Sequence, residues 1–128
     1  MSMPSNIPTS VIDMMPFVPA EDFALSLQFY ADLGFQARWA NEQMAELRIG
    51  SFGFLLQNFY IQQHAGNFVM TLMVEDADPW WRHVETAGFR DKYPDIMMKP
   101  PTLMPWGLRV LYLSDPSGVL WHIADRRS

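Results

Sequence analysis

Side chains that could hold a metal ion or transfer a proton are few in this sequence. It contains three histidines and no cysteine, which excludes disulfides, thiolate metal sites and a cysteine nucleophile. His64 falls in a polar connector and His83 on the outer face of an expected helix, so they do not suggest a shared site. His122 lies on the expected last strand. A lone strand histidine without an evident carboxylate partner more often contacts a ligand or supports the structure than acts as a general base.

No other catalytic pattern is present. The sequence has no glycine-rich phosphate loop, nucleophile elbow or paired-carboxylate signature, so we assign no catalytic residue. The formal charge of -5 and the absence of a basic cluster beyond Arg126-Arg127 argue against nucleic-acid binding. No apolar run approaches the roughly 20 residues needed to cross a bilayer. With no secretory signal evident, a cytoplasmic location away from membranes is expected.

The chain repeats itself, which indicates two related halves. Glu21-Asp22 and Gly34-Phe35 recur with the same spacing as Glu75-Asp76 and Gly88-Phe89. A later segment, 53–57, is repeated as 118–122, at an offset eleven residues longer. Because a duplication builds one structure from equivalent units, we expect Gln57 and His122, which end these segments, at equivalent places.

Each half is expected to contain a strand, a helix and three further strands. In the first half the strands are predicted at 11–18, 35–40, 44–49 and 52–59, with a helix capped by Asp22 and ended by Gly34. In the second half the strands are predicted at 68–74, 96–98, 108–113 and 119–124, with a helix from Asp76 to about Ala87 and a proline-rich loop at 100–105. The expected organisation is a flexible arm at 1–10 and one domain at 11–125, comprising module 1 (about 11–59), a connector (60–67) and module 2 (about 68–125).

This organisation resembles the vicinal oxygen chelate superfamily, which includes glyoxalase I, extradiol dioxygenases and the fosfomycin- and bleomycin-resistance proteins. The residues that carry the resemblance are Asp22, Ser26, Phe29-Tyr30, Leu33-Gly34-Phe35, Trp106-Gly107-Leu108-Arg109 and Asp115-Pro116-Ser117-Gly118. The resemblance implies an α+β fold in which two βαβββ modules form a cup-shaped mixed sheet. The bleomycin-resistance branch further implies a homodimer that exchanges its modules and forms two clefts at the interface.

The resemblance also indicates where a metal would be held. Metalloenzymes of the family take their ligands from the first and last strands of each module, which corresponds here to Met15, Gln57, Val69 and His122. Valine cannot bind a metal, methionine suits copper(I), and a glutamine oxygen is a weak ligand for a hard ion. We therefore expect no metal and no other cofactor.

The remaining features suit a small-molecule pocket. Strand alternation puts Gln57 on one face with Phe59, and His122 on an apolar face of the last strand. Trp39 and Trp106 lie at strand ends, where their flat rings could hold a planar or cationic ligand, or could pack a dimer interface. The loop residues Tyr60 and Met104 are further candidates. The predicted ligand-binding residues are Trp39, Gln57, Phe59, Tyr60, Met104, Trp106 and His122.

The resulting hypothesis is a metal-free, dimeric, bleomycin-resistance-like protein. It would sequester a drug-like molecule, either a cationic glycopeptide antibiotic or a planar aromatic compound, without changing it. One alternative is a glyoxalase- or dioxygenase-type metalloenzyme with a non-standard site that includes Gln57 and His122. Another is a regulatory module whose cleft takes a cellular metabolite.

Overall fold

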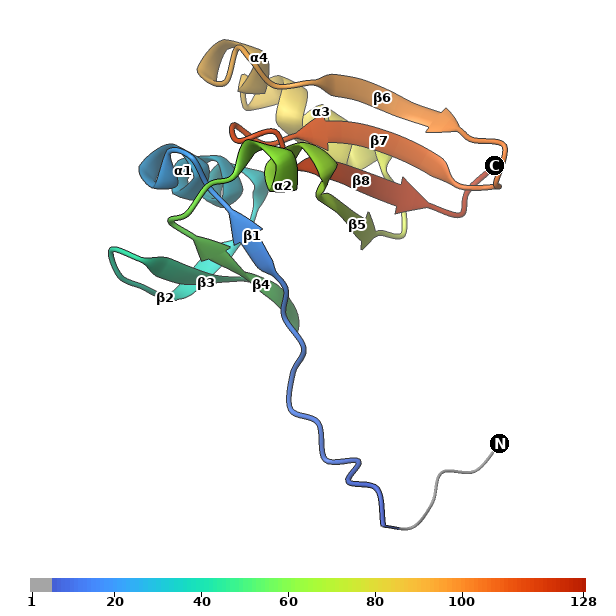
Figure 1. Ribbon diagram of the computed structural model, residues 1–128. Coiled ribbons are helices and arrows are strands. Elements are labelled where there is room, and N and C mark those ends of the chain that lie inside the picture. Colours follow the sequence, from blue (N-terminus) through green and yellow to red (C-terminus); the bar gives the residue numbers. More distant parts are fainter. Residues whose placement is uncertain (1–5) are drawn as a thin grey trace.

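Two four-stranded mixed sheets are built from the two halves of the chain, as the computed structural model of residues 6–128 shows (Figure 1). The N-terminal sheet contains β1 (Phe17–Pro19), β2 (Gln36–Ala40), β3 (Met44–Ile49) and β4 (Phe52–Gln57), with α1 (Phe23–Leu33) between β1 and β2. The C-terminal sheet contains β5 (Val69–Met73), β6 (Met98–Leu103), β7 (Arg109–Ser114) and β8 (Leu120–Asp125), with α3 (Asp78–Thr86) and α4 (Phe89–Lys92) between β5 and β6. The connecting segment contains α2 (Gln62–Asn67). The predicted α+β fold of two βαβββ modules is confirmed.

Both sheets have the same topology. Their strand orders are β1-β4-β3-β2 and β5-β8-β7-β6, so the first strand of each module is an edge strand that pairs in parallel with the last strand. The remaining neighbours are antiparallel. The sequence repeat therefore corresponds to a repeat of sheet topology.

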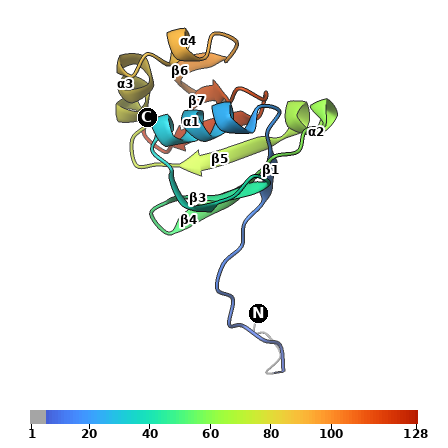
Figure 2. The ribbon, with the colours of Figure 1, turned by 90° about the vertical axis from the view of Figure 1, so that its left-hand side faces the viewer.

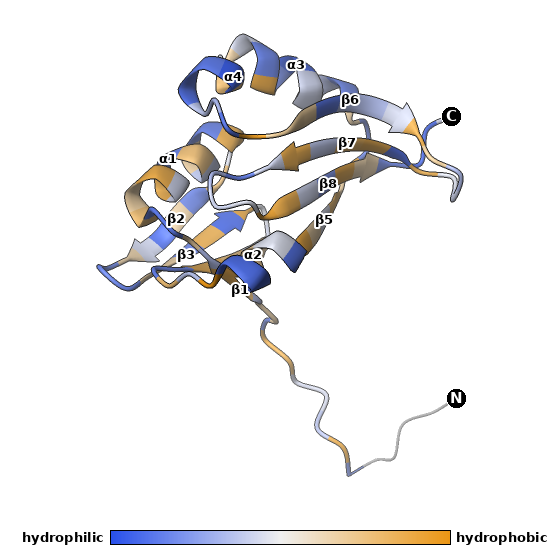
Figure 3. Ribbon diagram, turned by 45° about the horizontal axis from the view of Figure 1, so that its top comes forward, coloured by the Kyte–Doolittle hydropathy of each residue, from blue (hydrophilic) through white to orange (hydrophobic). Residues whose placement is uncertain are grey.

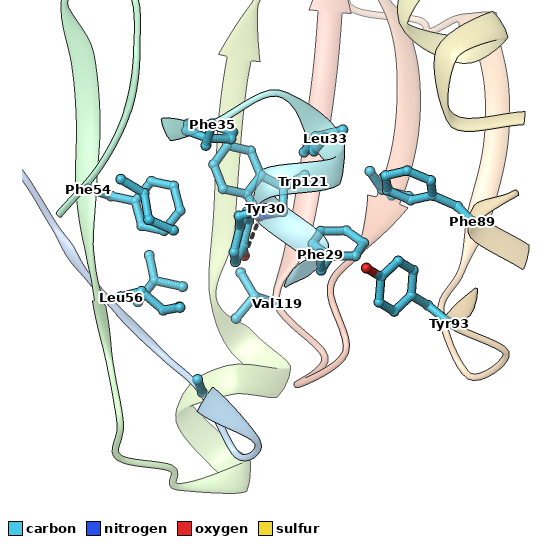
Figure 4. Packing of buried hydrophobic residues seen from close by; sticks show 14 of the residues in the cluster. Phe29, Tyr30, Leu33, Phe35, Phe54, Leu56, Phe89, Tyr93, Val119 and Trp121 are labelled. Atoms are coloured by element: carbon cyan, nitrogen blue, oxygen red, sulfur yellow. Dashed lines mark hydrogen bonds between the residues drawn. The ribbon is translucent and has the colours of Figure 1, made fainter. Parts of the chain in front are cut away.

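Helix α1 joins the two sheets through an aromatic core (Figure 4). Asp22 caps its N-terminus by accepting a hydrogen bond from the Leu25 amide, and Gly34 ends it with a φ of 128° that favours glycine. The fully buried Tyr30 packs against Phe54 of the N-terminal sheet and Trp121 of the C-terminal sheet, with ring centroids 4.9 and 5.7 Å away. The two modules thus share one core, and α1 lies between their sheets (Figure 2).

The predicted first strand, 11–18, is largely wrong. Only Phe17–Pro19 forms a strand with β4, although Pro16 O also accepts a hydrogen bond from Leu55 N. Residues 6–12 run away from the sheets (Figure 1). Hydrophobic residues occur along this segment (Figure 3). Among them, Val11 and Ile12 are exposed. Apolar alternation alone predicts a strand, but a strand also needs a neighbour for its main-chain groups. Residues 1–5 of the predicted arm lie outside the described residues.

The proline-rich segment was predicted to be a loop, which is also wrong. Strand β6 runs through Pro100 and Pro101, and its register against β7 shifts between Lys99 and Thr102. Proline lacks an amide hydrogen, but it is tolerated on an edge strand, and β6 is the outer strand of its sheet. The connector was predicted without a helix and contains α2. Within residues 6–128, no helix is long and apolar enough to cross a membrane.

Candidate functional site

Each sheet has one face turned toward α1 and one that is turned away, which we call the open face. On β4, Phe54 and Leu56 are buried in the shared core, so alternation places Leu55 and Gln57 on the open face. On β8, Trp121 and Ile123 are buried in that core. His122 therefore belongs to the open face of the C-terminal sheet, as Gln57 does to that of the N-terminal sheet.

The open face of the N-terminal sheet presents Trp39 beside a buried carboxylate. A register shift in β2 pairs Trp39 with Glu46, and the indole Nε1 donates a 3.2 Å hydrogen bond to Glu46 Oε1. Glu46 Oε2 lies 3.5 Å from Arg38 Nη1 and 3.8 Å from Arg48 Nε, and among the described residues it accepts no hydrogen bond. This contact fixes the edge of the indole while its ring remains partly exposed.

Gln57 and Phe59 meet at a pocket of about 290 Å³ beside α2. The pocket is lined by Phe17, Pro19, Gln57, Phe59, Ile61, His64 and Phe68. Its composition, an apolar wall with an amide and an imidazole, is that of a small-molecule site. Sequence reasoning set His64 aside as a connector residue. The polar composition of the connector did not reveal α2. This helix places His64 in the pocket beside Gln57, at the end of β4.

His122 lies in the middle of the open face of the C-terminal sheet. It pairs with Thr71 on β5 and Tyr112 on β7, and the Tyr112 and His122 rings meet edge to face with centroids 4.7 Å apart. Partial burial lowers the pKa of His122 below its ordinary value, because the charged imidazolium would lose hydration. His122 is therefore neutral at pH 7 and can act as one hydrogen-bond donor and one acceptor.

The other three predicted residues lie apart from these. Met104 and Trp106 occupy the turn between β6 and β7, where the Met104 amide donates to Leu108 O and the Gly107 amide donates to Met104 O. Trp106 is 60% exposed, whereas Tyr60 packs against the shared core. The structure thus brings Gln57 and Phe59 together, and puts Trp39 on the same sheet. His122, Met104 and Trp106 lie on the other sheet.

The residues at the family's metal positions do not suit a catalytic metal. Met15 Sδ accepts a 3.3 Å hydrogen bond from Arg48 Nη1, and Gln57 and His122 belong to different sheets. Within residues 6–128, no three His, Asp or Glu side chains gather as metal ligands. A set made of a thioether, an amide, an isopropyl group and one imidazole does not fit zinc, iron or manganese.

The sheet register also changes one equivalence within the repeat. Phe17 pairs with Leu55, and Val69 pairs with Leu120, the counterpart of Leu55 in the repeated segment. Phe17, not Met15, is therefore the counterpart of Val69. Counting back equally from Asp22 and Asp76 gave the wrong residue because Phe17 precedes Asp22 by five residues, whereas Val69 precedes Asp76 by seven. Phenylalanine supplies no metal ligand either.

Arg109 is a structural residue. Its guanidinium donates to Asp125 Oδ2 at 2.7 Å and to Asp76 and Asp78 at 3.1 Å. The hydrogen bond from Arg109 lowers the pKa of Asp125 to about 2. Asp125 also accepts a 2.7 Å hydrogen bond from the Ala77 amide. This cluster fixes the start of α3 to the end of β8.

Solved structures of similar fold include ligand-bound proteins. A bleomycin-binding protein complexed with bleomycin has 22% sequence identity and a TM-score of 0.77, covering 91% of this chain and 100% of its own. The bleomycin-binding protein from Streptomyces verticillus, complexed with copper(II)-bleomycin, has 23% identity and a TM-score of 0.75, covering 91% and 97%. Lactoylglutathione lyase from Agrobacterium tumefaciens has 19% identity and a TM-score of 0.65, covering 92% and 95%. At these identities the likeness establishes the fold alone.

Sequence comparison establishes the family. No curated protein matches the chain. The family model for the glyoxalase/bleomycin resistance protein/dioxygenase superfamily matches residues 12–123, nearly all of both modules. The chain therefore belongs to the glyoxalase/bleomycin resistance protein/dioxygenase superfamily.

Proposed function

We propose that this protein is a metal-free, bleomycin-resistance-like binding protein that sequesters a small molecule in a cleft between two copies of the chain. The observation that carries the proposal is the division of the predicted ligand residues between two sheets. Trp39, Gln57 and Phe59 belong to the N-terminal sheet and its end, whereas His122 and Trp106 belong to the C-terminal sheet and its turn. A second copy that sets its C-terminal open face against the first copy's N-terminal open face would complete the cleft.

Exposed apolar side chains support an interface at these faces. Phe17, Phe59, Val69 and Met73 lie on the first strands or near the pocket, and each is at least 41% exposed. Leaving this much apolar surface in water is unfavourable, and grouped exposed hydrophobic residues commonly mark an interaction site. The proposed assembly is a homodimer that exchanges its modules.

The side chains favour a planar aromatic ligand with polar edges. Trp39 offers a ring whose edge is fixed by Glu46, and neutral His122 and Gln57 offer hydrogen bonds without charge. A cationic glycopeptide antibiotic would in addition suit the formal charge of -5. Bleomycin, which the two similar binding proteins hold, is the first compound to test. The cytoplasmic location expected from the sequence is part of this proposal.

The metalloenzyme alternative is weaker because its ligand set does not fit a catalytic metal. The likeness to lactoylglutathione lyase concerns the fold, and no step of that chemistry can be assigned to Met15, Gln57, Phe17 or Val69. We therefore propose binding without catalysis.

Calorimetric titration of the protein with bleomycin and a panel of aromatic metabolites tests the proposal. We expect saturable binding of one ligand per chain, a dimer in analytical ultracentrifugation, and recovery of the ligand with unchanged mass. Trp39→Ala should weaken binding at least tenfold. Leu25→Ala, at a half-buried position of α1 that packs against the core and not on an open face, serves as the control for general damage. A chemically modified ligand, or a stoichiometric divalent metal that is lost in His122→Ala, would overturn the proposal.

A further inference from the structure

A row of four polar side chains crosses the open face of the C-terminal sheet. Lys99 of β6 pairs with Tyr112 of β7, Tyr112 pairs with His122 of β8, and His122 pairs with Thr71 of β5. Residues paired in this way project from the same face of a sheet. Met98, next to Lys99, is buried in the shared core, so alternation also puts Lys99 on the open face. We call these four side chains the polar row, and it follows the strand order β6, β7, β8, β5 that Figure 1 shows.

The polar groups of this row are not used to hold the fold together. Within residues 6–128, the hydrogen bonds and ion pairs made by side chains of β5 to β8 involve other residues. Tyr112 and His122 meet through their rings. Lys99 and Thr71 are exposed, and Tyr112 and His122 are half-buried. The ammonium, the two hydroxyls and the imidazole are therefore available to a molecule that covers this face.

Lys99 gives this face its charge. Among the strand residues that share the face, all of which the structure describes, Lys99 is the one with a formal charge at pH 7. Arg109 and Asp125 belong to the same strands, but they bond to each other on the opposite face. The net charge of -5 therefore arises on other surfaces of the chain, and this open face is positive.

The open face of the N-terminal sheet, which would form the other wall of the proposed cleft, has balanced charges. Arg48 forms a 2.7 Å ion pair with Asp13, and Glu46 Oε2 lies 3.5 Å from Arg38 Nη1. These two arginines offset the two carboxylates. The charge of Lys99 is therefore not compensated by the wall that faces it, and a positive charge in a cleft attracts an anionic ligand.

The hydrogen-bonding capacity of the polar row defines the anion. A lysine ammonium donates up to three hydrogen bonds, and each hydroxyl and the neutral imidazole donates one. A carboxylate accepts several such bonds and carries the one negative charge that Lys99 can balance, whereas a phosphate ester carries closer to two. The row therefore matches a carboxylate better than a phosphate.

The aromatic part of the ligand would rest on the other wall, where Trp39 of the second copy offers a flat ring. We infer that the polar row is a carboxylate-binding site and that the ligand of the cleft is a planar aromatic carboxylate. This inference rests on the proposed function. It selects the planar aromatic class over the cationic one and adds an acidic group to it.

A carboxylate of the second copy is the competing partner for Lys99, because an ion pair can also join two protein surfaces. The N-terminal open face favours the ligand, since Asp13 and Glu46 already lie beside arginines and Glu46 is buried. The two possibilities differ in an observable way. Loss of an ion pair between copies would weaken the dimer, whereas loss of a carboxylate site would weaken ligand binding and leave the dimer intact.

The test is a calorimetric titration with three naphthalenes of similar shape, namely 2-naphthoate, neutral 2-naphthamide and cationic 2-naphthylmethylammonium. We expect 2-naphthoate to bind at least tenfold more tightly than the other two. Lys99→Met, which keeps the length of the side chain, should remove this preference and leave 2-naphthamide binding within twofold of wild type. Lys99→Arg should retain the preference. Tyr112→Phe and Thr71→Val should each weaken 2-naphthoate binding at least threefold.

Lys92→Met is the matched control. It removes the same charge from α4, where Lys92 lies 3.4 Å from Asp32 and away from the open faces, and it should leave the binding of all three compounds unchanged. Analytical ultracentrifugation of Lys99→Met should show a dimer as stable as that of wild type.

Four results would overturn the inference. They are absence of 2-naphthoate binding, equal or tighter binding of 2-naphthamide or the cation, equal losses in Lys99→Met and Lys92→Met, and a weakened dimer in Lys99→Met with 2-naphthoate affinity unchanged. Failure of the proposed cleft looks different, because the protein would then be a monomer whose ligand binding Trp39→Ala leaves unchanged. A dimer that binds 2-naphthamide through Trp39 without preferring 2-naphthoate would refute the carboxylate site alone.

Discussion

The Tyr30 hydroxyl donates a 2.5 Å hydrogen bond to Asp115 Oδ2 from the centre of the shared core. The same hydroxyl accepts a 3.0 Å bond from the Trp121 indole. Asp115 Oδ1 accepts from the amides of Ser117 and Val119, which shapes the turn into β8. Tyr30 belongs to α1 of module 1, and Asp115 belongs to the Asp-Pro-Ser-Gly turn of module 2. Their hydrogen bond therefore joins the two modules.

Removing the Tyr30 hydroxyl should destabilise the whole protein. In Tyr30→Phe, the buried Asp115 carboxylate loses a donor and the Trp121 indole loses its acceptor, and an unsatisfied buried group costs roughly 1–3 kcal/mol or more when charged. We expect a fall of about 2–4 kcal/mol in the free energy of unfolding, measured with urea. Tyr112→Phe, whose ring rather than hydroxyl contacts His122, should change it by less than about 1 kcal/mol. Equal effects would contradict a joining role for Tyr30.

A substitution at Gly53 should loosen the open face of the N-terminal sheet. A Cβ there would lie 2.7 Å from both Arg48 Nη1 and Leu47 O, so Arg48 would have to leave its place over the strand. Its 2.7 Å ion pair with Asp13, which holds the residues just before β1 against the sheet, would be lost. We expect Gly53→Ala to cost about 1–3 kcal/mol and to increase proteolysis before Phe17.

Gly66→Ala is the control for that experiment, because a Cβ at Gly66 meets nothing within 4 Å and the residue lies in α2. Alanine in place of a helical glycine stabilises by roughly 0.5–1 kcal/mol. A Gly53→Ala protein with unchanged stability and unchanged proteolysis would show that Arg48 has other places to lie.

The sequence predicted local features better than pairings. Asp22 and Gly34 define α1 through cap chemistry contained within a few residues, and both were identified correctly. The extent of β1 and the path of β6 depend on which strand lies alongside. Pro100 and Pro101 are acceptable only because β6 is an outer strand, and no local pattern contains that information.

The candidate site shows the same limit. Alternation predicted one strand face for Gln57 and one for His122, because the period of a strand is local, and the core residues Phe54 and Trp121 lie on the opposite faces. It could not place the two residues on separate sheets with α1 between them. It also missed His64, which joins Gln57 only through the fold of the connector. Tyr30 and Asp115 were noted as motif residues, but their mutual hydrogen bond required the tertiary structure.

Acid should unfold the protein partly through Asp125. Its pKa is about 2 in the folded protein against 3.8 ordinarily, so its pairing with Arg109 stabilises the fold above about pH 4 and is lost as the pH falls toward 2. In Asp125→Asn, urea unfolding should show lower stability at pH 7 and a shallower loss between pH 4 and 2. Asp91→Asn, at an exposed position on α4, should keep the wild-type profile. Parallel profiles for wild type and Asp125→Asn would contradict this assignment.

The neutral state of His122 should set the pH dependence of ligand binding. Burial alone lowers its pKa below 6.5, so the imidazole is neutral at pH 7 and gains a proton only in more acidic solution. A ligand that uses the neutral ring as an acceptor should bind with constant affinity from pH 7 to 8 and more weakly below the lowered pKa.

Tyr112→Ala removes the ring that packs against His122 and should raise the pKa of His122 toward 6.5, as followed by NMR of the imidazole. The pH at which ligand binding weakens should then rise by the same amount as the pKa of His122. A shift of the imidazole pKa without a shift of the binding profile would remove His122 from the proposed cleft.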